Sequence, residues 1–331
     1  MKKVEDTKGQ SRLEKAIEKL RDQYGVGAIL TKDNTPEKVE AIPTGCFVLD
    51  DILGCGGLPR GRILEVYGSE SSGKTSLTLF LAAQLQKQGK TVAFIDVENA
   101  FDRKYASSIG VDVDKLLVSQ AETLEETMDI IRALAETNEV DLIIVDSVAA
   151  LTPKAELEGE EMLKDTMALM ARLLGKSLRI LGGPIARSKT VCIFINQLRD
   201  KIGVFYGEKS ATPGGRAIKF WSSVRLSVTK GDKIKGPKDE AIGVQLKITA
   251  VKNKVAIPWK TGEIELIFGS GINLEKDALI TGVDKGIIIR TGNNYTYGEA
   301  KLGVGEKQAV ETLKKNPELF EELKKEIKNK L

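Results

Sequence analysis

The chain has 331 residues, of which 41% are hydrophobic and 29% are charged, a composition typical of folded globular proteins and not of disordered or fibrous ones. Its formal net charge is only +3, so any binding of nucleic acid must come from a local basic patch rather than from the charge of the whole molecule. No apolar run approaches the roughly 20 residues of a membrane span, and no apolar stretch follows Met1 to serve as a signal peptide, so we expect a cytoplasmic protein that binds no membrane.

The sequence contains no histidine, which limits the chemistry available to it. Ser-His and Cys-His nucleophilic catalysis, histidine-ligated zinc and histidine general bases are all excluded. We therefore expect any general base to be a carboxylate. Three cysteines, Cys46, Cys55 and Cys192, show no C-x-x-C spacing and are interpreted as small buried side chains in a reducing compartment.

The N-terminal segment, residues 1–36, is expected to form an amphipathic helix followed by a polar linker. Ser11 and Glu14 make a capping box, and Gly25 ends the helix. One apolar stripe lies between them, made of Leu13, Ala16, Ile17, Leu20 and Tyr24. This stripe needs a surface to cover it, either the core of the same chain or a neighbouring subunit.

Residues 37–272 alternate between short apolar runs and helical patterns. Four runs are continuously apolar, which favours a parallel sheet covered on both faces: Ile63–Tyr67, Thr91–Asp96, Leu142–Asp146 and Val191–Asn196. Helical spacing separates them, as in Leu77, Phe80, Leu81, Leu85 and in Leu124, Met128, Ile131, Leu134. Two later runs, Ser223–Val228 and Val244–Val251, are predicted to extend the sheet as a hairpin. The sequence therefore predicts an α/β domain with a mostly parallel central sheet, and residues 273–331 are predicted to form a small α+β domain.

A glycine-bounded loop between the first strand and a helix is predicted to bind a nucleotide. Two glycines let backbone N–H groups turn inward at the positive end of the helix dipole. Lys74 then reaches the β and γ phosphates, and the Thr75 hydroxyl is available to Mg²⁺. The expected nucleotide-binding residues are Gly68, Ser69, Glu70, Ser71, Ser72, Gly73, Lys74, Thr75 and Ser76.

Polar residues end the other strands at the same edge of the sheet. Asp146 closes its strand where it can hold Mg²⁺ opposite Thr75. Glu98 is favoured as the carboxylate that orients and deprotonates the attacking water, because it lies just beyond its strand, although Asp96 competes for this role by position. Gln197 ends a third strand, where a neutral amide can sense a γ phosphate and relay its presence to the next segment of the chain.

The segment after Gln197, residues 198–216, is too long and too rich in glycine for a plain connection, so we interpret it as a functional loop. Cations and aromatic residues are interleaved in it, a pattern that suits single-stranded nucleic acid: Arg199, Lys201, Phe205, Tyr206, Lys209 and Arg216.

Lys252 and Lys254 continue the even positions of the apolar row Val244, Leu246, Ile248 and Ala250. In a regular strand both lysines would emerge on the covered face, where they would require an anion. That anion is either a carboxylate of this chain or the phosphate of a nucleotide on an adjacent subunit.

Five motifs together closely resemble the bacterial RecA recombinase family. They are Gly68–Thr75, Phe94–Glu98, Val145–Lys154, Phe194–Arg199 and Val251–Val255, and the likeness runs from about residue 11 to the C-terminus. The resemblance implies a RecA-type P-loop NTPase core carrying an N-terminal helix arm. It also implies a DNA-dependent ATPase that uses ATP and Mg²⁺, forms a helical filament on single-stranded DNA, pairs it with a homologous duplex and exchanges strands. A self-cleaving repressor and a single-strand-binding protein are further partners that the family suggests.

The resemblance also implies roles for individual residues. Glu98 matches the catalytic glutamate of the family, Asp102 and Tyr105 match its adenine contacts, and Lys252 and Lys254 match the pair that reaches the ATP of the neighbouring protomer. Two DNA-binding loops are implied, at about residues 158–167 and 198–216, with the contacts Met167, Arg172, Arg179, Arg199, Lys201, Ile202, Val204, Gly214, Gly215 and Arg216. The first helix and Phe220 would lie at the subunit interface.

Two other functions are compatible with the same core. One is a RecA-fold DNA motor or ring ATPase without strand exchange, although such proteins commonly lack a long basic glycine loop beside Gln197. The other is a scaffold in which the ATP-bound filament promotes repressor cleavage without needing turnover.

Overall fold

The computed structural model describes residues 11–25, 29, 39–159, 166–200 and 210–330, which form two compact units, residues 1–39 and 40–331. The first unit contains helix α1 (Arg12–Tyr24), which begins at the predicted capping box of Ser11 and Glu14 and ends at Gly25 with φ 89°. No residue of α1 is buried, and Leu13 and Tyr24 are more than two-thirds exposed. The helix is confirmed, and its apolar stripe remains uncovered within its own unit.

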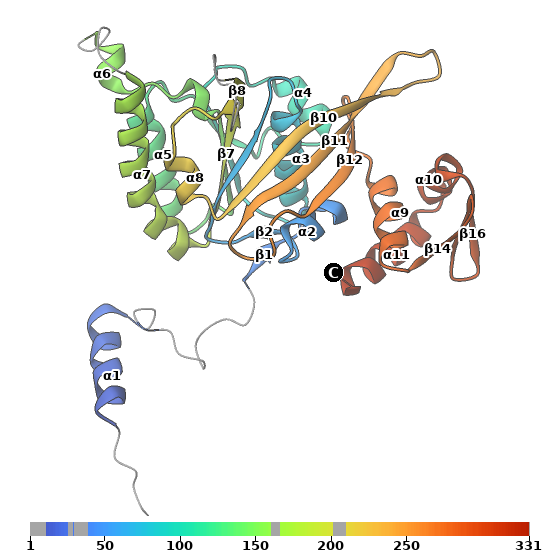
Figure 1. The fold of residues 1–331 in the computed structure, drawn as a ribbon, viewed down its shortest axis with the longest axis horizontal. Helices are drawn as coiled ribbons and strands as arrows, with labels where there is room; N and C mark the ends of the chain where they lie inside the picture. The colour runs from blue at the N-terminus through green and yellow to red at the C-terminus, as the bar shows by residue number, and fades with distance from the viewer. Residues whose placement is uncertain (1–10, 26–28, 30–38, 160–165, 201–209, 331) are drawn as a thin grey trace, which may run out of the picture. The chain divides into compact units, whose positions relative to one another are not determined.

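The second unit is built on a central sheet that has nine strands in the described residues (Figure 1). Its order is β13 (Gly271–Ile272), β12 (Thr261–Ile267), β11 (Ala241–Asn253), β10 (Val224–Lys235), β3 (Ile63–Gly68), β7 (Val191–Gln197), β6 (Leu142–Asp146), β4 (Val92–Asp96) and β5 (Leu117–Ser119). Strands β10 to β5 in this order are parallel, whereas β11, β12 and β13 are added antiparallel. The predicted α/β class, the mostly parallel sheet and the hairpin are therefore confirmed.

Helices cover both faces of this sheet, as the continuously apolar strands require. One face packs on α3 (Lys74–Lys87) and α4 (Arg103–Ile109), and the other on α5 (Leu124–Glu136), α7 (Thr166–Ser188) and α8 (Ala217–Trp221) (Figure 1). Short elements complete the unit: β1 (Ala41–Ile42), α2 (Phe47–Leu53), β2 (Leu58–Pro59), the 3-10 turn η3 (Val148–Ala150), α6 (Lys154–Leu157), β8 (Arg199–Asp200) and β9 (Ser210–Ala211). Among the described residues, no helix is both long and apolar enough to cross a membrane.

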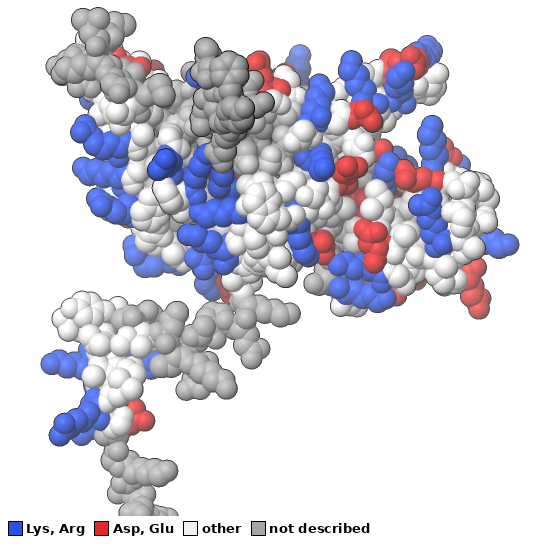
Figure 2. Space-filling model, in the orientation of Figure 1, with Lys and Arg blue, Asp and Glu red and all other residues white. Residues whose placement is uncertain are grey.

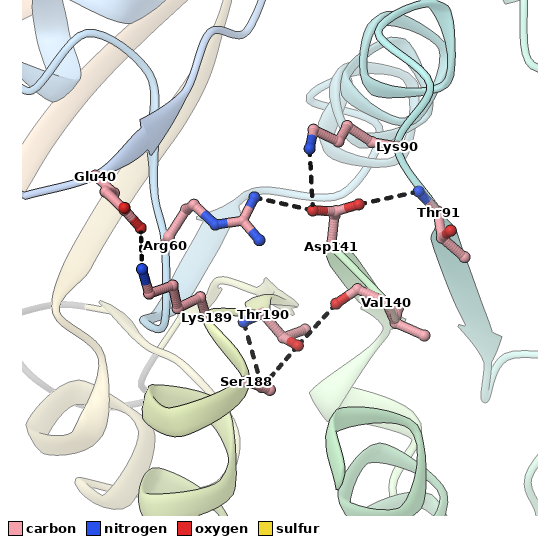
Figure 3. A network of polar contacts seen from close by, with 9 residues as sticks. All are labelled: Glu40, Arg60, Lys90, Thr91, Val140, Asp141, Ser188, Lys189 and Thr190. Atoms are coloured by element: carbon pink, nitrogen blue, oxygen red, sulfur yellow. Dashed lines mark hydrogen bonds and ion pairs between the residues drawn. The ribbon is translucent and has the colours of Figure 1, made fainter. Parts of the chain in front are cut away.

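At the amino ends of the strands, the carboxylate of Asp141 contacts Arg60, Lys90 and Thr91 (Figure 3). Asp141, just before β6, accepts hydrogen bonds from Arg60 Nη1 at 2.9 Å and from the Thr91 N–H at 3.2 Å, and its ion pair with Lys90 spans 3.5 Å. Three loops that are distant in sequence therefore meet at the edge opposite the glycine-bounded loop. This leaves the carboxyl ends of the strands for function.

The C-terminal elements have a hydrophobic cluster of their own. They are α9 (Leu274–Asp284), β14 (Ile288–Thr291), β15 (Asn294–Tyr297), β16 (Ala300–Val304), α10 (Glu306–Lys315) and α11 (Pro317–Lys330), and the last two helices are divided at Asn316 and Pro317 as predicted. Asp277 of α9 accepts hydrogen bonds from the backbone N–H groups of Phe47 at 2.7 Å and Val48 at 2.9 Å. A carboxylate of the C-terminal region thus caps the first turn of α2.

Candidate functional site

The glycine-bounded loop has the geometry of a phosphate cradle. A Cβ on Gly68 would lie 2.2 Å from the Val228 carbonyl oxygen, so only glycine fits there, and Gly73 enters α3 with φ 87°. Lys74 is 7% exposed and its Nζ donates to the Ser69 carbonyl at 2.7 Å, which folds the ammonium back over the loop. Burial lowers the pKa of Lys74 from its ordinary value, against the opposing effect of neighbouring carboxylates.

A cavity of about 210 Å³ opens over this loop. It is lined by Ser71, Ser72, Gly73, Lys74, Thr75, Ser76, Lys230, Val244, Leu266 and Phe268. The Ser72 hydroxyl is fully buried and has no hydrogen-bond partner in the described part of the chain, a state that costs free energy unless a ligand supplies one. Loop N–H groups, an ammonium and an unsatisfied hydroxyl together fit a polyphosphate.

The predicted metal-binding pair is in contact. Thr75 Oγ1 donates to Asp146 Oδ2 at 2.7 Å. Burial raises the pKa of Asp146 to about 6 against the lowering effect of this hydrogen bond, and the carboxylates of Glu98 and Asp96 add to the rise. A buried carboxylate crowded by other carboxylates favours a bound cation, and a hydroxyl plus one carboxylate is a typical protein share of a magnesium site on a nucleotide.

Glu98 and Asp96, the two candidates for the general base, differ in exposure and in hydrogen-bond partners. Glu98 is exposed at the crevice, and its Oε1 accepts hydrogen bonds from Ser147 Oγ at 2.5 Å and from Gln197 Nε2 at 3.2 Å. Asp96 is 2% exposed, and its two oxygens accept the backbone N–H groups of residues 100 and 101 at 3.1 and 3.0 Å. Asp96 therefore shapes the loop, whereas Glu98 is placed where a water can reach it.

The two expected adenine contacts, Asp102 and Tyr105, lie at the start of α4. Asp102 accepts from the N–H groups of Lys104 at 2.8 Å and Tyr105 at 3.1 Å, so it is the N-cap of this helix. The Tyr105 hydroxyl lies 2.5 Å from Ser76 Oγ, which ties α4 to the first turn of α3. Both residues therefore lie beside the loop, with one oxygen of Asp102 occupied by capping.

Most of the described residues expected to contact DNA cluster around α7. Arg172 and Arg179 are exposed on one face of this helix together with Lys176, and Figure 2 shows Lys and Arg side chains crowded over it. Gly214 and Gly215 have φ of 79° and 64°, and a Cβ on either would approach the α7 side chains of Leu174 or Ala171. The loop end thus lies on α7, and the exposed Arg216 follows directly.

The remaining expected DNA contacts are placed less fully. Arg199 is exposed in β8, which pairs with β9 at the two ends of the second loop. Met167 lies in the first turn of α7. Lys201, Ile202 and Val204, and most of the first loop at residues 158–167, lie outside the described residues.

The expectation that Lys252 and Lys254 continue the apolar row of β11 is wrong. Leu226 pairs with Ala250 but Arg225 pairs with Lys252, so an extra residue bulges the strand and turns Lys252 to the opposite face. Its Nζ donates to the carbonyls of Lys219 at 2.5 Å and Phe220 at 3.1 Å.

Both lysines nevertheless lie at the C-terminal end of β11, where Lys252 is partly buried and Lys254 is exposed. Burial lowers the pKa of Lys252, and the nearby cations Lys254 and Arg225 lower it further. Lys254 is exposed, and Phe220, the predicted interface residue, is 68% exposed. An anion supplied from outside the chain would therefore be attracted to this end of the strand.

Three residues of the site were not predicted from the sequence. Ser147 follows Asp146 directly, and its hydroxyl holds Glu98; its place at a strand end was an available signal. Lys230 and Phe268 line the cavity over the loop from β10 and from the residue after β12. They come close because β10, β11 and β12 lie in order beside β3, the strand that leads into the loop, and sequence spacing contains no signal for this order.

Comparisons with known proteins agree with this geometry. The model of the RecA N-terminal domain matches residues 11–273, and that of the RecA C-terminal domain matches residues 277–331. Protein RecA of Acholeplasma laidlawii (strain PG-8A) is 45% identical over 98% of both chains, and Protein RecA of Thermus aquaticus is 46% identical over 98% of this chain and 95% of its own. The crystal structure of the RadB recombinase matches 68% of this chain and 95% of its own with a TM-score of 0.50 at 21% identity, a likeness of fold. Since the two family models cover nearly all of the chain, it belongs to the RecA recombinase family.

Proposed function

We propose that this protein performs its family's reaction, ATP-dependent strand exchange, with a site made of the Gly68–Ser76 loop, Asp146 and Glu98. RecA proteins are DNA-dependent ATPases of recombination and repair, so the enzymatic class follows from family membership. The ring ATPase without strand exchange is not favoured, because the similar curated relatives are RecA proteins. The assignment of roles to particular residues rests on the geometry described above.

The proposed mechanism uses the chain's own groups in three places. Lys74 and the loop N–H groups hold the phosphates, and Thr75 and Asp146 hold Mg²⁺, which when bound neutralises phosphate charge during transfer. Glu98 orients a water and accepts its proton at Oε1 or Oε2 as the water attacks the γ phosphorus, whose bond to the bridging oxygen breaks so that ADP leaves with that oxygen. Ser147 and Gln197 keep the Glu98 carboxylate in position by their hydrogen bonds.

The observation that carries the proposal is the hydrogen bond from Gln197 Nε2 to Glu98 Oε1 at 3.2 Å. Gln197 is the last residue of β7 and directly precedes the second loop. A γ phosphate that attracts the Gln197 amide would compete with this bond and shift the loop that we propose grips DNA. The exposed cations of α7 and Arg216 would supply phosphate contacts on the same side.

The proposed assembly is a filament in which ATP lies between two copies. The exposed apolar stripe of α1 and the exposed Phe220 offer contact surfaces, and Lys252 and Lys254 would reach the nucleotide of the neighbour. Residues 1–36, 37–272 and 273–331 are proposed as arm, ATPase core and small C-terminal domain. We also propose a repressor and a single-strand-binding protein as partners and a cytoplasmic location, because the family acts on DNA.

The test is the ATPase rate with and without single-stranded DNA. We expect DNA to stimulate turnover in the wild-type protein and Lys74→Ala to abolish the stimulated rate, because the ammonium that holds the phosphates is lost. Lys87→Ala, an exposed lysine in the last turn of the same helix, is the matched control and should keep the wild-type rate. Absence of DNA stimulation, or a Lys74→Ala variant that turns over normally, would defeat the proposal.

A further inference from the structure

A carboxylate is buried in the middle of the central sheet, where an apolar side chain would pack without electrostatic cost. Glu65 of β3 is 0% exposed; its Oε2 accepts from Arg225 Nε at 2.5 Å and its Oε1 from Asn196 Nδ2 at 2.9 Å. Removing two charges from water is expensive, and apolar replacements of buried ion pairs are often as stable or more stable. The groups that Glu65 holds in place offer a better reason for it than stability does.

On one side Glu65 holds the strand that leads into the second loop. Asn196 of β7 is also 0% exposed, and besides its bond to Glu65 its Nδ2 donates to the Pro213 carbonyl at 3.2 Å. Its Oδ1 accepts the backbone N–H of Gln197 at 2.9 Å. One side chain therefore links both ends of the loop 198–216, and Glu65 fixes the orientation of that side chain.

On the other side Glu65 accepts a hydrogen bond from Arg225 of β10, the strand that pairs with Lys252 of β11. Arg225 of β10 lies over the Tyr67 ring, with Cζ 4.5 Å from the ring centroid, and its side chain is 12% exposed. Arg225 pairs in the sheet with Glu65 on one neighbour and with Lys252 on the other. The Glu65 carboxylate raises the pKa of Lys252 while Arg225 lowers it, so the three charges lie within electrostatic reach of one another.

These residues form a row of polar side chains across four adjacent strands: hydrogen bonds join Arg225, Glu65, Asn196 and Gln197, and Lys252 is the partner of Arg225 in the register of the sheet. The row runs from Lys252 on β11 through Arg225 on β10 and Glu65 on β3 to Asn196 and Gln197 on β7, and Gln197 bonds to Glu98. Charge-assisted hydrogen bonds link β10, β3 and β7, and the backbone pairing of β10 with β11 extends this connection to Lys252. A displacement of Gln197 would therefore either be resisted by the residues at the Lys252 end of the row or displace them as well.

We propose that Glu65 is a positioning residue of the ATPase: it fixes Asn196 and Arg225 so that the Gln197 end and the Lys252 end of the row adopt their active positions together. Glu65 is buried out of reach of the cavity over the loop and acts only through its two partners. The inference rests on the proposed function, because it assigns work to Gln197 and Lys252. It predicts that the row affects DNA-stimulated turnover and not the affinity for ATP.

The experiment compares Glu65→Gln with Asp141→Asn. Both exchanges remove one carboxylate charge paired with an arginine, but Asp141 lies just before β6 and makes no hydrogen bond or ion pair with a residue of the row among the described residues. The values of kcat and KM for ATP are measured with and without an oligothymidylate, at a temperature at which circular dichroism shows each variant folded. We expect Glu65→Gln to lower the DNA-stimulated kcat about 10-fold with KM within about 2-fold, and Asp141→Asn to change neither by more than about 2-fold.

A second variant covers the case in which Glu65→Gln does not fold, because it leaves Arg225 buried without its partner. The double variant Glu65→Gln with Arg225→Met removes both charges and fills the space of the arginine stem. If Glu65 positions its partners, the double variant folds and keeps the low DNA-stimulated kcat. A return of kcat to the wild-type value would show that only the unpaired charge mattered and would overturn the proposal.

Failure of this inference is distinct from failure of the proposed function. If wild-type turnover is DNA-stimulated and Lys74→Ala abolishes it, while Glu65→Gln matches Asp141→Asn, then the function stands and the role of Glu65 is wrong. If the wild-type protein shows no DNA-stimulated turnover at all, the proposed function itself fails and the inference fails with it.

Discussion

The carboxylates of this molecule divide into those that shape the backbone and those placed for chemistry. Asp96 and Asp277 each accept two backbone N–H groups and are almost fully buried, whereas Glu98 is exposed and held only by side chains. Sequence position alone left Asp96 and Glu98 in competition, because Asp96 ends a strand and Glu98 lies two residues beyond it. The difference lies in which loop N–H groups fold back onto Asp96, and a strand pattern contains no information about that turn.

The division between Asp96 and Glu98 can be tested by paired substitutions. Glu98→Gln should reduce turnover by about 10²-fold or more while leaving the thermal midpoint unchanged, because only the proton acceptor is lost. Asp96→Asn should instead lower stability by about 1–2 kcal/mol, because one of the two loop N–H groups loses its acceptor. Turnover assays and thermal unfolding of both variants measure this. A Glu98→Gln variant that hydrolyses ATP at the wild-type rate would exclude Glu98 as the base.

The buried Asp50 predicts a specific pH dependence of stability. Burial raises its pKa from 3.8 to about 7, against hydrogen bonds from the Thr44 hydroxyl and N–H. The folded state therefore binds more protons than the unfolded state between these values, so the stabilising contribution is complete below pH 3.8 and is lost as the pH rises through about 7.

Asp50→Asn should remove this contribution, since the amide oxygen can still accept from Thr44 and no longer ionises. Relative to the variant, the wild-type protein should lose on the order of 2 kcal/mol of unfolding free energy between about pH 5 and about pH 8. Urea unfolding at the two pH values measures the difference. Parallel pH profiles of the two proteins would show that Asp50 does not titrate in this range.

At the scale of elements, the sequence predicted the strands and caps well and the edge of the sheet poorly. The continuously apolar runs at β3, β4, β6 and β7 appeared within about one residue of their expected bounds, because burial on both faces leaves little choice of residue. The bulge in β11 that turns Lys252 was missed, since period-2 alternation assumes a regular strand. The glycine-bounded loop was predicted because its backbone geometry demands particular residues.

Gly68 gives the sharpest test of that demand. Gly68→Ala would place a Cβ 2.2 Å from the Val228 carbonyl oxygen, which forces β10 away from the loop. We expect a loss of about 1–3 kcal/mol in stability and a weakened affinity for ATP. Gly175→Ala in α7 is the control, because its Cβ would meet only Ala217 at 3.6 Å and should be neutral or stabilising by up to about 1 kcal/mol. Equal behaviour of the two variants in unfolding and nucleotide titrations would contradict this interpretation of the loop.

At the scale of the whole molecule, several features of one chain fit the filament that its family forms. No residue of α1 is buried by the described residues of its own unit, Phe220 is exposed, and Lys252 donates to the backbone carbonyls of Lys219 and Phe220. Composition and net charge contain no trace of this arrangement, because an interface between identical chains uses ordinary surface residues. Periodicity left a neighbouring subunit open as one possibility, for the apolar stripe and for Lys252 and Lys254, and the resemblance to a family favoured it.

The most direct measurement is the ATPase activity of a mixture of two inactive variants. The Lys74→Ala variant lacks the lysine that holds the phosphates but keeps Lys252. The Lys252→Ala variant keeps Lys74 but lacks Lys252. If ATP lies between two chains, a site formed by one chain of each variant can contain both lysines. With single-stranded DNA present, the mixture should recover turnover that neither variant shows alone, and sedimentation should show polymers in both. If the mixture shows only the sum of the separate rates, ATP is not held between two copies of this chain.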